Sequence, residues 1–252
     1  MTWGYGDLSC YGQRHFETPI LDDLAKNGLR FTDHYSGATV CSPARCSLMT
    51  GRDAGHASIR GNGPHVLLPD PPDKTVATYL RQAGYCMAMI GKSSVTGNTQ
   101  TPQTVLEKGF DVFYGTTDHR DGHFRYPLFV SEQTKKVMLE GNTRRRGSHY
   151  DAELYAAKAE EFIAAQSEKT PFFLLLSLPV PHASVVAPEG KADAINIADD
   201  VDYSGSKHYS NVKNVKANYA AMVKEIRFHR RSGHVCFGSE EFGRGHLGNV
   251  YK

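Results

Sequence analysis

The chain has 252 residues, of which 40% are hydrophobic and 22% are charged, and its formal net charge is +2. This composition is typical of a soluble globular protein that is long enough for one large domain or two small ones. The small net charge, and the lack of any apolar run of about 18 residues, argue against nucleic acid or membrane as a partner. Five scattered cysteines are too few for a disulfide framework.

The amino-terminal part predicts a loop, a helix and a strand. Residues 3–12 are punctuated by glycine and indicate a loop. Thr18 and Pro19 form a helix start, and Gly28 is the matching stop. The alternation of apolar and polar residues over Leu29–Tyr35 predicts a strand.

A cysteine follows at the next predicted helix start, in the stretch Cys41-Ser42-Pro43-Ala44-Arg45. Pro43 suits the first helical position, because its φ is fixed and it has no N–H to leave unpaired. Cys41 would then lie beside exposed backbone N–H groups and the positive end of the helix dipole, which favour an anion. Arg45 is four residues further on and shares the same helical face. The pattern indicates a nucleophile in a site for a small tetrahedral anion, the alternative being a buried structural cysteine.

The middle of the chain predicts a parallel sheet. Lys74–Ala83 has the periodicity of a helix, and the apolar run Tyr85–Ile90 is typical of a buried strand. A helix that leads into such a strand indicates a crossover unit, and therefore a sheet covered on both faces. Gly109–Tyr114 and Tyr126–Val130 are weaker strand patterns, and residues 131–148 indicate an exposed hairpin or insertion.

The last part predicts two more helices around a strand. Apolar residues recur at helical spacing from Tyr155 to Ile163, and again from Tyr219 to Ile226. Phe172–Leu178 is the most apolar strand pattern of the chain, and prolines end it. Residues 188–210 are polar and indicate a loop.

The sequence around Cys41 resembles the first signature of the sulfatases, because the segment from Cys41 to Arg45 is followed by Leu48-Met49-Thr50-Gly51-Arg52. In that family a separate enzyme reads Cys-x-Pro-x-Arg and oxidises the cysteine to formylglycine. One hydroxyl of the hydrated aldehyde attacks the ester sulfur, and the other expels sulfate. The resemblance implies an α/β fold, an alkaline-phosphatase-like sandwich with a mostly parallel central sheet flanked by helices, incomplete in this chain. It also implies an arylsulfatase-like hydrolase that cleaves a sulfate ester to an alcohol or phenol plus sulfate.

Three further residues match positions of this family. Lys92, after the predicted strand, resembles the lysine of the second signature, which contacts the sulfate. His182 follows the strand at 172–178 and a proline, as does the family histidine that binds sulfate and protonates the leaving alcohol. His123 lies in a segment that resembles a substrate-side loop. The resemblance thus implies Cys41, Arg45 and His182 as catalytic residues and Lys92, His182 and His123 as substrate-binding residues.

The chain also departs from the family pattern. Sulfatases hold a divalent cation, usually calcium, with carboxylate and amide oxygens. Met1 and Thr2 stand where the first aspartate pair would lie, and nothing after Ile226 resembles the later Asp-Asn pair. Ser94 replaces a histidine that many members carry. Of the expected metal ligands only Cys41, as formylglycine, is present. Because a metal can supply several kcal/mol of a barrier, these departures predict weak or absent activity.

The resemblance gives a domain division and a compartment. We predict a partial sulfatase amino-terminal catalytic domain over residues 1–227 and an irregular tail over 228–252 that is not native to the fold. Sulfatases are usually periplasmic, secreted or lysosomal, yet no signal peptide precedes Trp3. We therefore expect the chain to start inside a longer reading frame.

Other functions are open at this stage. Relatives with formylglycine also hydrolyse phosphonate or phosphate monoesters, and the chain could instead be an inactive remnant or an anion-binding protein. A redox dithiol of Cys41 and Cys46 is a weaker alternative, because the spacing is not Cys-x-x-Cys. The expected partners are a sulfate-ester small molecule or glycan and the formylglycine-generating enzyme.

Overall fold

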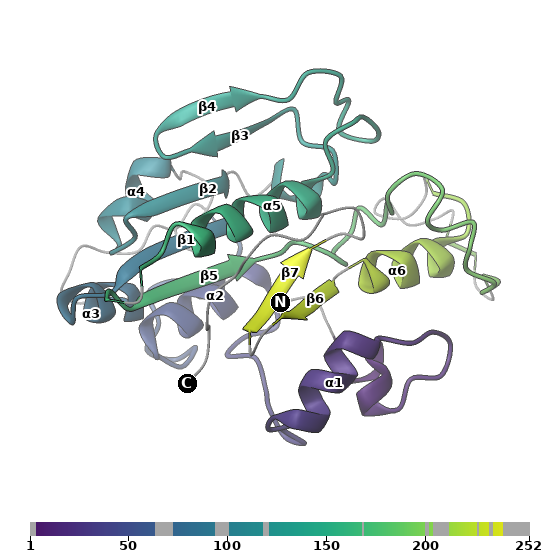
Figure 1. Cartoon of the computed structure of the whole chain (residues 1–252), viewed down its shortest axis with the longest axis horizontal. Coiled ribbons are helices and arrows are strands. Elements are labelled where there is room, and N and C mark those ends of the chain that lie inside the picture. The colour runs from purple at the N-terminus through teal and green to yellow at the C-terminus, as the bar shows by residue number, and fades with distance from the viewer. Residues whose placement is uncertain are drawn as a thin grey trace.

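A five-stranded sheet forms the frame of the protein, with helices on both of its faces (Figure 1). The strand order is β4-β3-β2-β1-β5. Strands β2, β1 and β5 run parallel, and the β3–β4 hairpin joins β2 in the antiparallel direction. The sheet is therefore mostly parallel, as the sequence predicts. Its strands are β1 (Cys86–Lys92), β2 (Val112–Thr116), β3 (Phe129–Glu132), β4 (Lys135–Met138) and β5 (Phe172–Ser177).

The computed structural model describes residues 4–63, 73–93, 101–117, 121–167, 169–199, 202–203, 212–225, 227–231 and 234–238, the last two ranges as backbone. The sequence-based expectations for Met1, Thr2, Ser94 and Ile226 lie outside the described residues.

Strand β1 lies between its two parallel partners, β2 and β5, and its side chains are buried on both faces. Met87 and Met89 point to one face and pack with β2 and its flanking helices. Ala88 and Ile90 point to the other face and pack with the helix over Asp151–Ala164. This division follows from the two-residue repeat of a strand, and burial on both faces is typical of parallel sheets. The predicted buried strand is confirmed, and it extends as far as Lys92.

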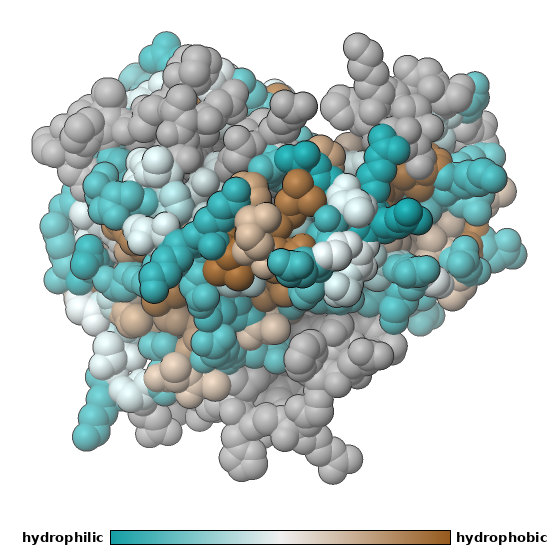
Figure 2. All heavy atoms as spheres, turned by 90° about the horizontal axis from the view of Figure 1, so that it is seen from above, coloured by the Kyte–Doolittle hydropathy of each residue, from teal (hydrophilic) through white to brown (hydrophobic). Residues whose placement is uncertain are grey.

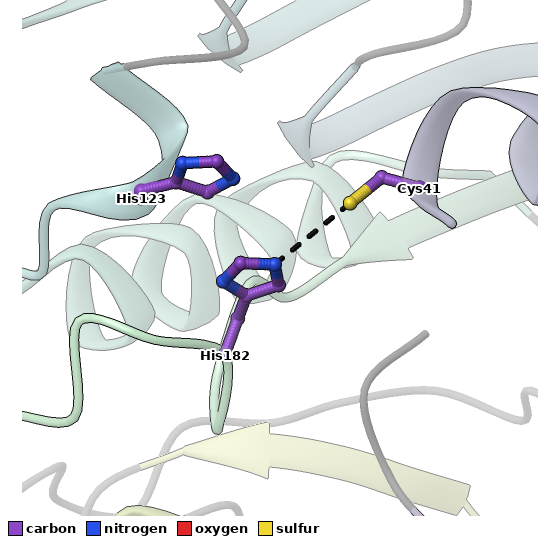
Figure 3. Close-up of side chains that lie close together, drawn as sticks. All are labelled: Cys41, His123 and His182. Atoms are coloured by element: carbon purple, nitrogen blue, oxygen red, sulfur yellow. Dashed lines mark hydrogen bonds between the residues drawn. The ribbon is translucent and has the colours of Figure 1, made fainter. Parts of the chain in front are cut away.

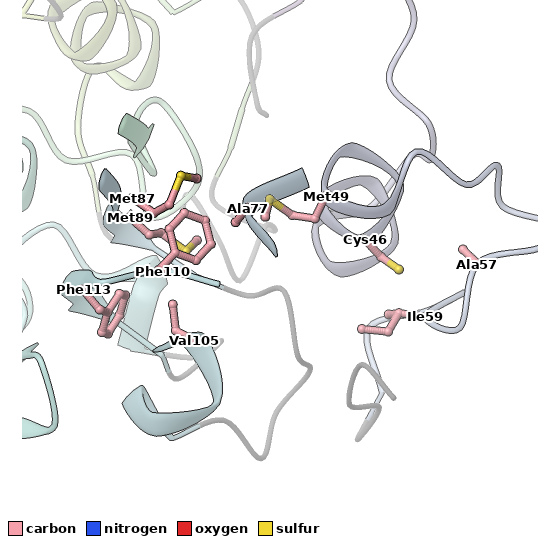
Figure 4. Packing of buried hydrophobic residues seen from close by; sticks show 10 residues of the cluster. All are labelled: Cys46, Met49, Ala57, Ile59, Ala77, Met87, Met89, Val105, Phe110 and Phe113. Carbon is pink, nitrogen blue, oxygen red and sulfur yellow. The ribbon is translucent and has the colours of Figure 1, made fainter. Parts of the chain in front are cut away.

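The helices form the outer layers. Helices α2, α3 and α4 contribute to the core on one face, and α5 covers the other (Figure 1). Figure 4 shows the first of these cores, in which Cys46 and Met49 of α2 belong to the same buried cluster as side chains of α3, α4 and the sheet. Helix α6 packs on the segment after β5 in a third cluster. The helices are α1 (Pro19–Asn27), α2 (Cys41–Thr50), α3 (Val76–Gln82), α4 (Pro102–Glu107), α5 (Asp151–Ala164) and α6 (Val215–Lys224).

The strongest helix signals of the sequence are confirmed. Helices α1, α3, α5 and α6 lie where the sequence predicts a helix. Thr75 shows why α3 begins where it does, since its side chain accepts a hydrogen bond from the backbone N–H of Thr78. Such a cap satisfies one of the N–H groups that the first helical turn leaves unpaired.

The strand predicted at Leu29–Tyr35 is wrong, because this segment is irregular in the structure. Its apolar side chains are exposed: Leu29 is 80% exposed and Tyr35 is 83% exposed. A strand needs a neighbouring strand for its backbone hydrogen bonds, and none lies beside this segment within the described residues. Alternation alone was therefore not enough to predict pairing.

The segment after Arg227 also differs in part from the expected irregular tail. The backbone of β6 (Arg227–Arg231) pairs antiparallel with β7 (His234–Gly238), and this hairpin lies between α1 and the sheet (Figure 1). The domain division at residue 227 stays a prediction. The predicted hairpin within 131–148 is present in its first half as β3 and β4.

The surface is mixed in character. The face seen in Figure 2 carries a small hydrophobic area toward its middle, and hydrophilic side chains surround it. Within the part of the chain that the structure describes, no helix has the length and apolar character needed to cross a bilayer.

Candidate active site

Cys41 is the first residue of α2, so the helix begins two residues earlier than Pro43 predicts. Val40 precedes it in an extended conformation and accepts a hydrogen bond from Ala44 N–H. The backbone N–H of Ser42 donates to Asn62 Oδ1 at 3.1 Å, and Pro43 has no N–H. The helix start therefore offers an anion fewer N–H groups than the sequence suggests. Positive charge near Cys41 must come mainly from side chains.

His182 lies opposite Cys41, with its Nε2 3.8 Å from the Cys41 Sγ (Figure 3). Its Nδ1 contacts the carbonyl oxygen of Ala183, which requires Nδ1 to carry the proton in the neutral ring. Nε2 then keeps the lone pair that faces the sulfur. Burial lowers the pKa of His182 and the charges of Lys92 and Arg125 lower it further, whereas the contact with Ala183 raises it.

His123 stacks on His182, with ring centroids 4.4 Å apart and an interplanar angle of 6° (Figure 3). It ends the short 3-10 turn η4 (Asp121–His123), which follows β2. Its carbonyl oxygen accepts a hydrogen bond from Ser184 N–H at 3.1 Å, which ties this turn to the segment after β5. The structure thus brings together three residues that are far apart in the sequence.

Arg45 points from α2 to the carboxyl ends of two strands. Its Nη1 donates to the carbonyl oxygen of Lys92 at 2.9 Å and contacts Ser177 Oγ. Ser177 Oγ donates to the same carbonyl oxygen at 2.7 Å. Burial lowers the pKa of the Arg45 guanidinium, and the charge of Cys41 opposes this shift. Arg45 therefore fixes the cysteine-bearing helix against β1 and β5.

Lys92 is the last residue of β1 and is only 2% exposed. Its aliphatic stem passes over Gly122, where a Cβ would lie 2.9 Å from Lys92 Cδ. A buried ammonium at the carboxyl end of a parallel strand lies where ligands of open α/β sheets gather. The sequence prediction for the location of Lys92 agrees with this placement, and its role stays a prediction.

Arg125 adds a third cation that the sequence does not single out. The side chain is fully buried, and its Nη1 is 3.2 Å from the Asp151 carboxylate. Its Nη2 donates to the carbonyl oxygen of Gly122 at 3.0 Å, one residue before His123. Burial raises the pKa of Asp151 to about 6, although the positive charge of Arg125 opposes the shift. Arg125 is thus a positioning residue for the turn that carries His123.

The donors around Cys41 do not fit calcium. Within the described residues, the only group of three or more His, Cys, Asp or Glu donors that lie close together is Cys41, His123 and His182. Calcium takes about 6–8 oxygen ligands. These side chains offer sulfur and nitrogen instead, so this group of donors does not make up a calcium site.

Fold and site together define an α/β protein that carries a potential nucleophile at a helix start, close to buried cations at the carboxyl ends of parallel strands. The family model described as Sulfatase matches residues 2–226, which is most of the chain. The chain therefore belongs to the sulfatase family.

Relatives of known function show the extent of the similarity. N-acetylgalactosamine-6-sulfatase of Homo sapiens is 28% identical over 207 residues, which cover 73% of this chain and 38% of that protein. Arylsulfatase A of Homo sapiens is 40% identical over 119 residues, which cover 44% of this chain and 23% of that protein. The chain thus spans less than half the length of these relatives.

Solved structures agree with the predicted fold. The crystal structure of Ps i-CgsB in complex with k-i-k-neocarrahexaose has a TM-score of 0.68 at 25% identity and covers 88% of this chain and 49% of that chain. The phosphonate monoester hydrolase of Agrobacterium radiobacter has a TM-score of 0.55 at 18% identity, over 88% of this chain and 54% of that chain. The second likeness shows the fold alone. The predicted alkaline-phosphatase-like α/β architecture is confirmed.

Proposed function

We propose that the site around Cys41 is the sulfate-binding and catalytic part of a sulfate-ester hydrolase. The observation that carries the proposal is the placement of Cys41 Sγ 3.8 Å from His182 Nε2, with Arg45 and Lys92 joined through the Lys92 carbonyl oxygen. Family membership supports the reaction class, because the sulfatases named above are hydrolases of sulfate esters. Converted to formylglycine, Cys41 would supply a hydrated aldehyde as the oxygen nucleophile.

Arg45 and Lys92 would stabilise the charge of the sulfate group. Lys92 provides a compact ammonium, and the Arg45 guanidinium stays charged even though burial lowers its pKa. The Arg45 guanidinium bonds the Lys92 carbonyl and Ser177, and the Lys92 stem packs on Gly122, before any ligand arrives. Charges that are arranged in advance stabilise a transition state without further reorganisation. The two cations would therefore bind sulfate and help the ester oxygen to leave.

His182 would move the proton. With Nδ1–H directed at the Ala183 carbonyl, its free Nε2 can accept a proton from a hydroxyl group at the position of Sγ. The lowered pKa keeps the ring neutral at the start of the reaction. Once protonated, His182 is an acid strong enough to protonate the departing alkoxide or phenoxide. His123, stacked on this ring, would line the substrate side.

Because the donors around Cys41 do not fit calcium, we propose that this chain by itself hydrolyses sulfate esters slowly. Calcium, as a hard cation, would need carboxylate ligands. We propose a sulfate-ester small molecule or glycan as the substrate of the whole protein, and its modification would need the formylglycine-generating enzyme.

The decisive experiment is intact-mass analysis of the protein followed by an assay of aryl sulfate hydrolysis. The chain is co-expressed with a formylglycine-generating enzyme, and conversion of Cys41 lowers the mass by about 18 Da. Hydrolysis of an aryl sulfate is then measured with calcium and with a chelator. We expect slow hydrolysis that Cys41→Ala abolishes and that Cys86→Ser leaves unchanged. Rapid calcium-dependent turnover would overturn the low-activity proposal, and no hydrolysis by fully modified protein would favour an inactive remnant or an anion-binding protein.

The same assay distinguishes sulfate-ester hydrolysis from hydrolysis of phosphonate or phosphate monoesters. Cations that bind sulfate also bind the other tetrahedral anions, so a phosphonate or phosphate monoester fits the site chemically. Rates on sulfate, phosphate and phosphonate esters of one phenol would be compared. A higher kcat/KM for either phosphorus ester would replace sulfate-ester hydrolysis as the proposed function.

The contribution of Lys92 can be measured against a matched lysine. Lys92→Met removes the buried charge and keeps most of the packing against Gly122. We expect kcat/KM to fall at least tenfold, which corresponds to about 1.4 kcal/mol of transition-state stabilisation. Lys74→Met, at a lysine that bonds Gln82 in an exposed position, should leave kcat/KM unchanged.

A further inference from the structure

Three potential metal ligands meet in one place, and none of them is an oxygen. The Sγ of Cys41 and one ring nitrogen each of His123 and His182 all lie within 4.8 Å of one another. They come from three separate elements: the start of α2, the turn η4 and the segment after β5 (Figure 3). A sulfur and two imidazoles are ligands that soft or borderline divalent cations prefer.

The distance between the Cys41 and His182 ligand atoms fits a tetrahedral ion. With Zn–S near 2.3 Å and Zn–N near 2.05 Å, a tetrahedral angle places sulfur and nitrogen about 3.6 Å apart. The Cys41 Sγ and His182 Nε2 are 3.8 Å apart in the absence of any ion. One ring nitrogen of His123 lies within 4.8 Å of both of these atoms.

The surroundings of His182 also resemble those of a metal ligand. Histidines that bind metal usually donate the second ring N–H to a carbonyl or carboxylate, which fixes the tautomer and the ring orientation. Here Nδ1 contacts the Ala183 carbonyl, and the backbone N–H of His182 donates to the Pro179 carbonyl at 2.9 Å. The other ring nitrogen, Nε2, is directed at Cys41.

We propose that the unmodified form of the protein binds one Zn²⁺-class cation through Cys41, His123 and His182. The thiol of Cys41 releases its proton on binding, and the thiolate, the two neutral imidazoles and one water or anion complete four-fold coordination. This site needs the cysteine sulfur, whereas the proposed hydrolase needs formylglycine. The same three residues therefore have two exclusive states, and the covalent state of Cys41 selects between them.

The charges nearby set the expected strength of the site. Lys92, Arg125 and Arg45 repel a divalent cation, and the Cys41 thiolate offsets only part of this repulsion. We therefore expect weaker binding than at a structural zinc site with several thiolates. An anion in the fourth position would reduce the repulsion, so sulfate should increase the affinity for zinc.

Cobalt titration tests the proposal directly. Full-length protein with an unmodified Cys41, verified by mass, is titrated with Co²⁺ and then with competing Zn²⁺. We expect one equivalent of Co²⁺, a near-ultraviolet thiolate-to-cobalt charge-transfer band, and loss of the band when Zn²⁺ is added. Cys41→Ser should remove the band, and His123→Ala or His182→Ala should weaken binding at least tenfold.

Two matched variants control for adventitious binding. Cys86→Ser changes a thiol at the opposite end of β1, and His56→Ala changes an exposed histidine that contacts Asp53. Both should leave the cobalt spectrum and affinity unchanged. A band that persists in Cys41→Ser, or an affinity that depends on Cys86 or His56, would overturn the proposal. So would wild-type protein that binds neither ion at up to about 100 μM metal, a Kd corresponding to roughly 5.5 kcal/mol.

A second measurement stays valid if a histidine variant fails to fold. Alkylation of wild-type protein by iodoacetamide is followed peptide by peptide, with and without Zn²⁺. We expect zinc to slow the alkylation of Cys41 at least tenfold and to leave Cys10 and Cys86 unaffected. Equal alkylation rates of Cys41 with and without zinc would contradict the proposal. Neither measurement involves ester hydrolysis, so a failure here leaves the proposed hydrolase untouched.

Discussion

The carboxyl edge of the sheet and the amino-terminal segment 4–40 are held in the fold by different means. At the sheet edge, Lys92 and Arg125 are buried cations whose positions are fixed by neighbouring strands and turns. In the segment 4–40, Thr18 and Leu21 are the only buried residues that the structure describes. The site geometry depends on fully buried polar side chains, whereas the amino-terminal segment is held by part-buried hydrogen bonds, such as those of Ser9 with Thr18 and Asp22.

Breaking the buried ion pair should have the largest effect. Asp151→Ala leaves the Arg125 charge buried without its carboxylate partner, and removal of one member of a buried pair costs about 3–5 kcal/mol. We expect the free energy of unfolding in urea to fall by that amount. Asp53→Ala removes the partner of exposed His56 and is the control, with little change expected. A loss at Asp151 no larger than at Asp53 would show that the pair does not hold the edge.

A methyl group added at one glycine of each region should have a large effect at the sheet edge and a small effect in the amino-terminal segment. Gly115 has φ +152°, and a Cβ there would lie 1.9 Å from the Gly91 carbonyl oxygen, which belongs to the rigid backbone of β1. We expect Gly115→Ala to cost about 1–3 kcal/mol in urea unfolding. Gly6→Ala, in the amino-terminal segment, meets nothing within 4 Å and should change stability little. Equal effects would mean that the strands can separate at their carboxyl ends.

A side-chain hydrogen bond joins the amino-terminal segment to α6. The hydroxyl of Tyr219 donates to the Asp7 carboxylate at 2.8 Å. Tyr219→Phe should cost about 0.5–1.5 kcal/mol, the usual net value of one hydrogen bond. Hydrogen exchange of the amides in residues 5–22 should quicken, with no change in β1. Tyr35→Phe, at an exposed tyrosine, is the matched control.

The last prediction concerns the pH dependence of stability. The pKa of His182 is lower in the folded protein than in the unfolded chain, mainly because of burial. The unfolded chain therefore binds a proton first as the pH falls through about 6.5, and folding stability decreases below that pH. His182→Gln should remove this part of the pH dependence. Urea unfolding of both proteins between pH 5 and pH 7.5 measures the difference, and identical profiles would show that His182 does not contribute.

The sequence predicts best where a local pattern and the buried environment agree. The apolar run before Lys92 has one plausible conformation, and its helix-to-strand context places Lys92 at the carboxyl end of a parallel strand. His182 is located in the same way, since prolines end the strand that precedes it. In both cases a short pattern fixes the position of the site residue.

Long-range polar contacts account for most of what the sequence does not predict. Arg125 and Asp151 each have the character of a surface residue in sequence, and only the folded chain buries them as a pair. Ser177 ends an apolar strand without any sign that it contacts Arg45. The one signal in the sequence for Asp151 is its position at the start of α5. An acidic residue is equally typical of an exposed helix start. The strand prediction for Leu29–Tyr35 fails for the opposite reason, because the alternating pattern is present there but no neighbouring strand is described beside it.

Arg45 has two roles that a single substitution would change together. Its guanidinium bonds both the Lys92 carbonyl and Ser177, and the single ammonium of a lysine cannot reproduce this planar arrangement of donors. The arginine that a modifying enzyme would read in the pentapeptide is therefore also a structural connection between α2 and the sheet. If such an enzyme modifies this chain, a variant at Arg45 would change both its recognition and the contact of α2 with the sheet. Installing the modification first and exchanging the arginine afterwards, for example by joining two peptide segments, would separate these two roles of one side chain.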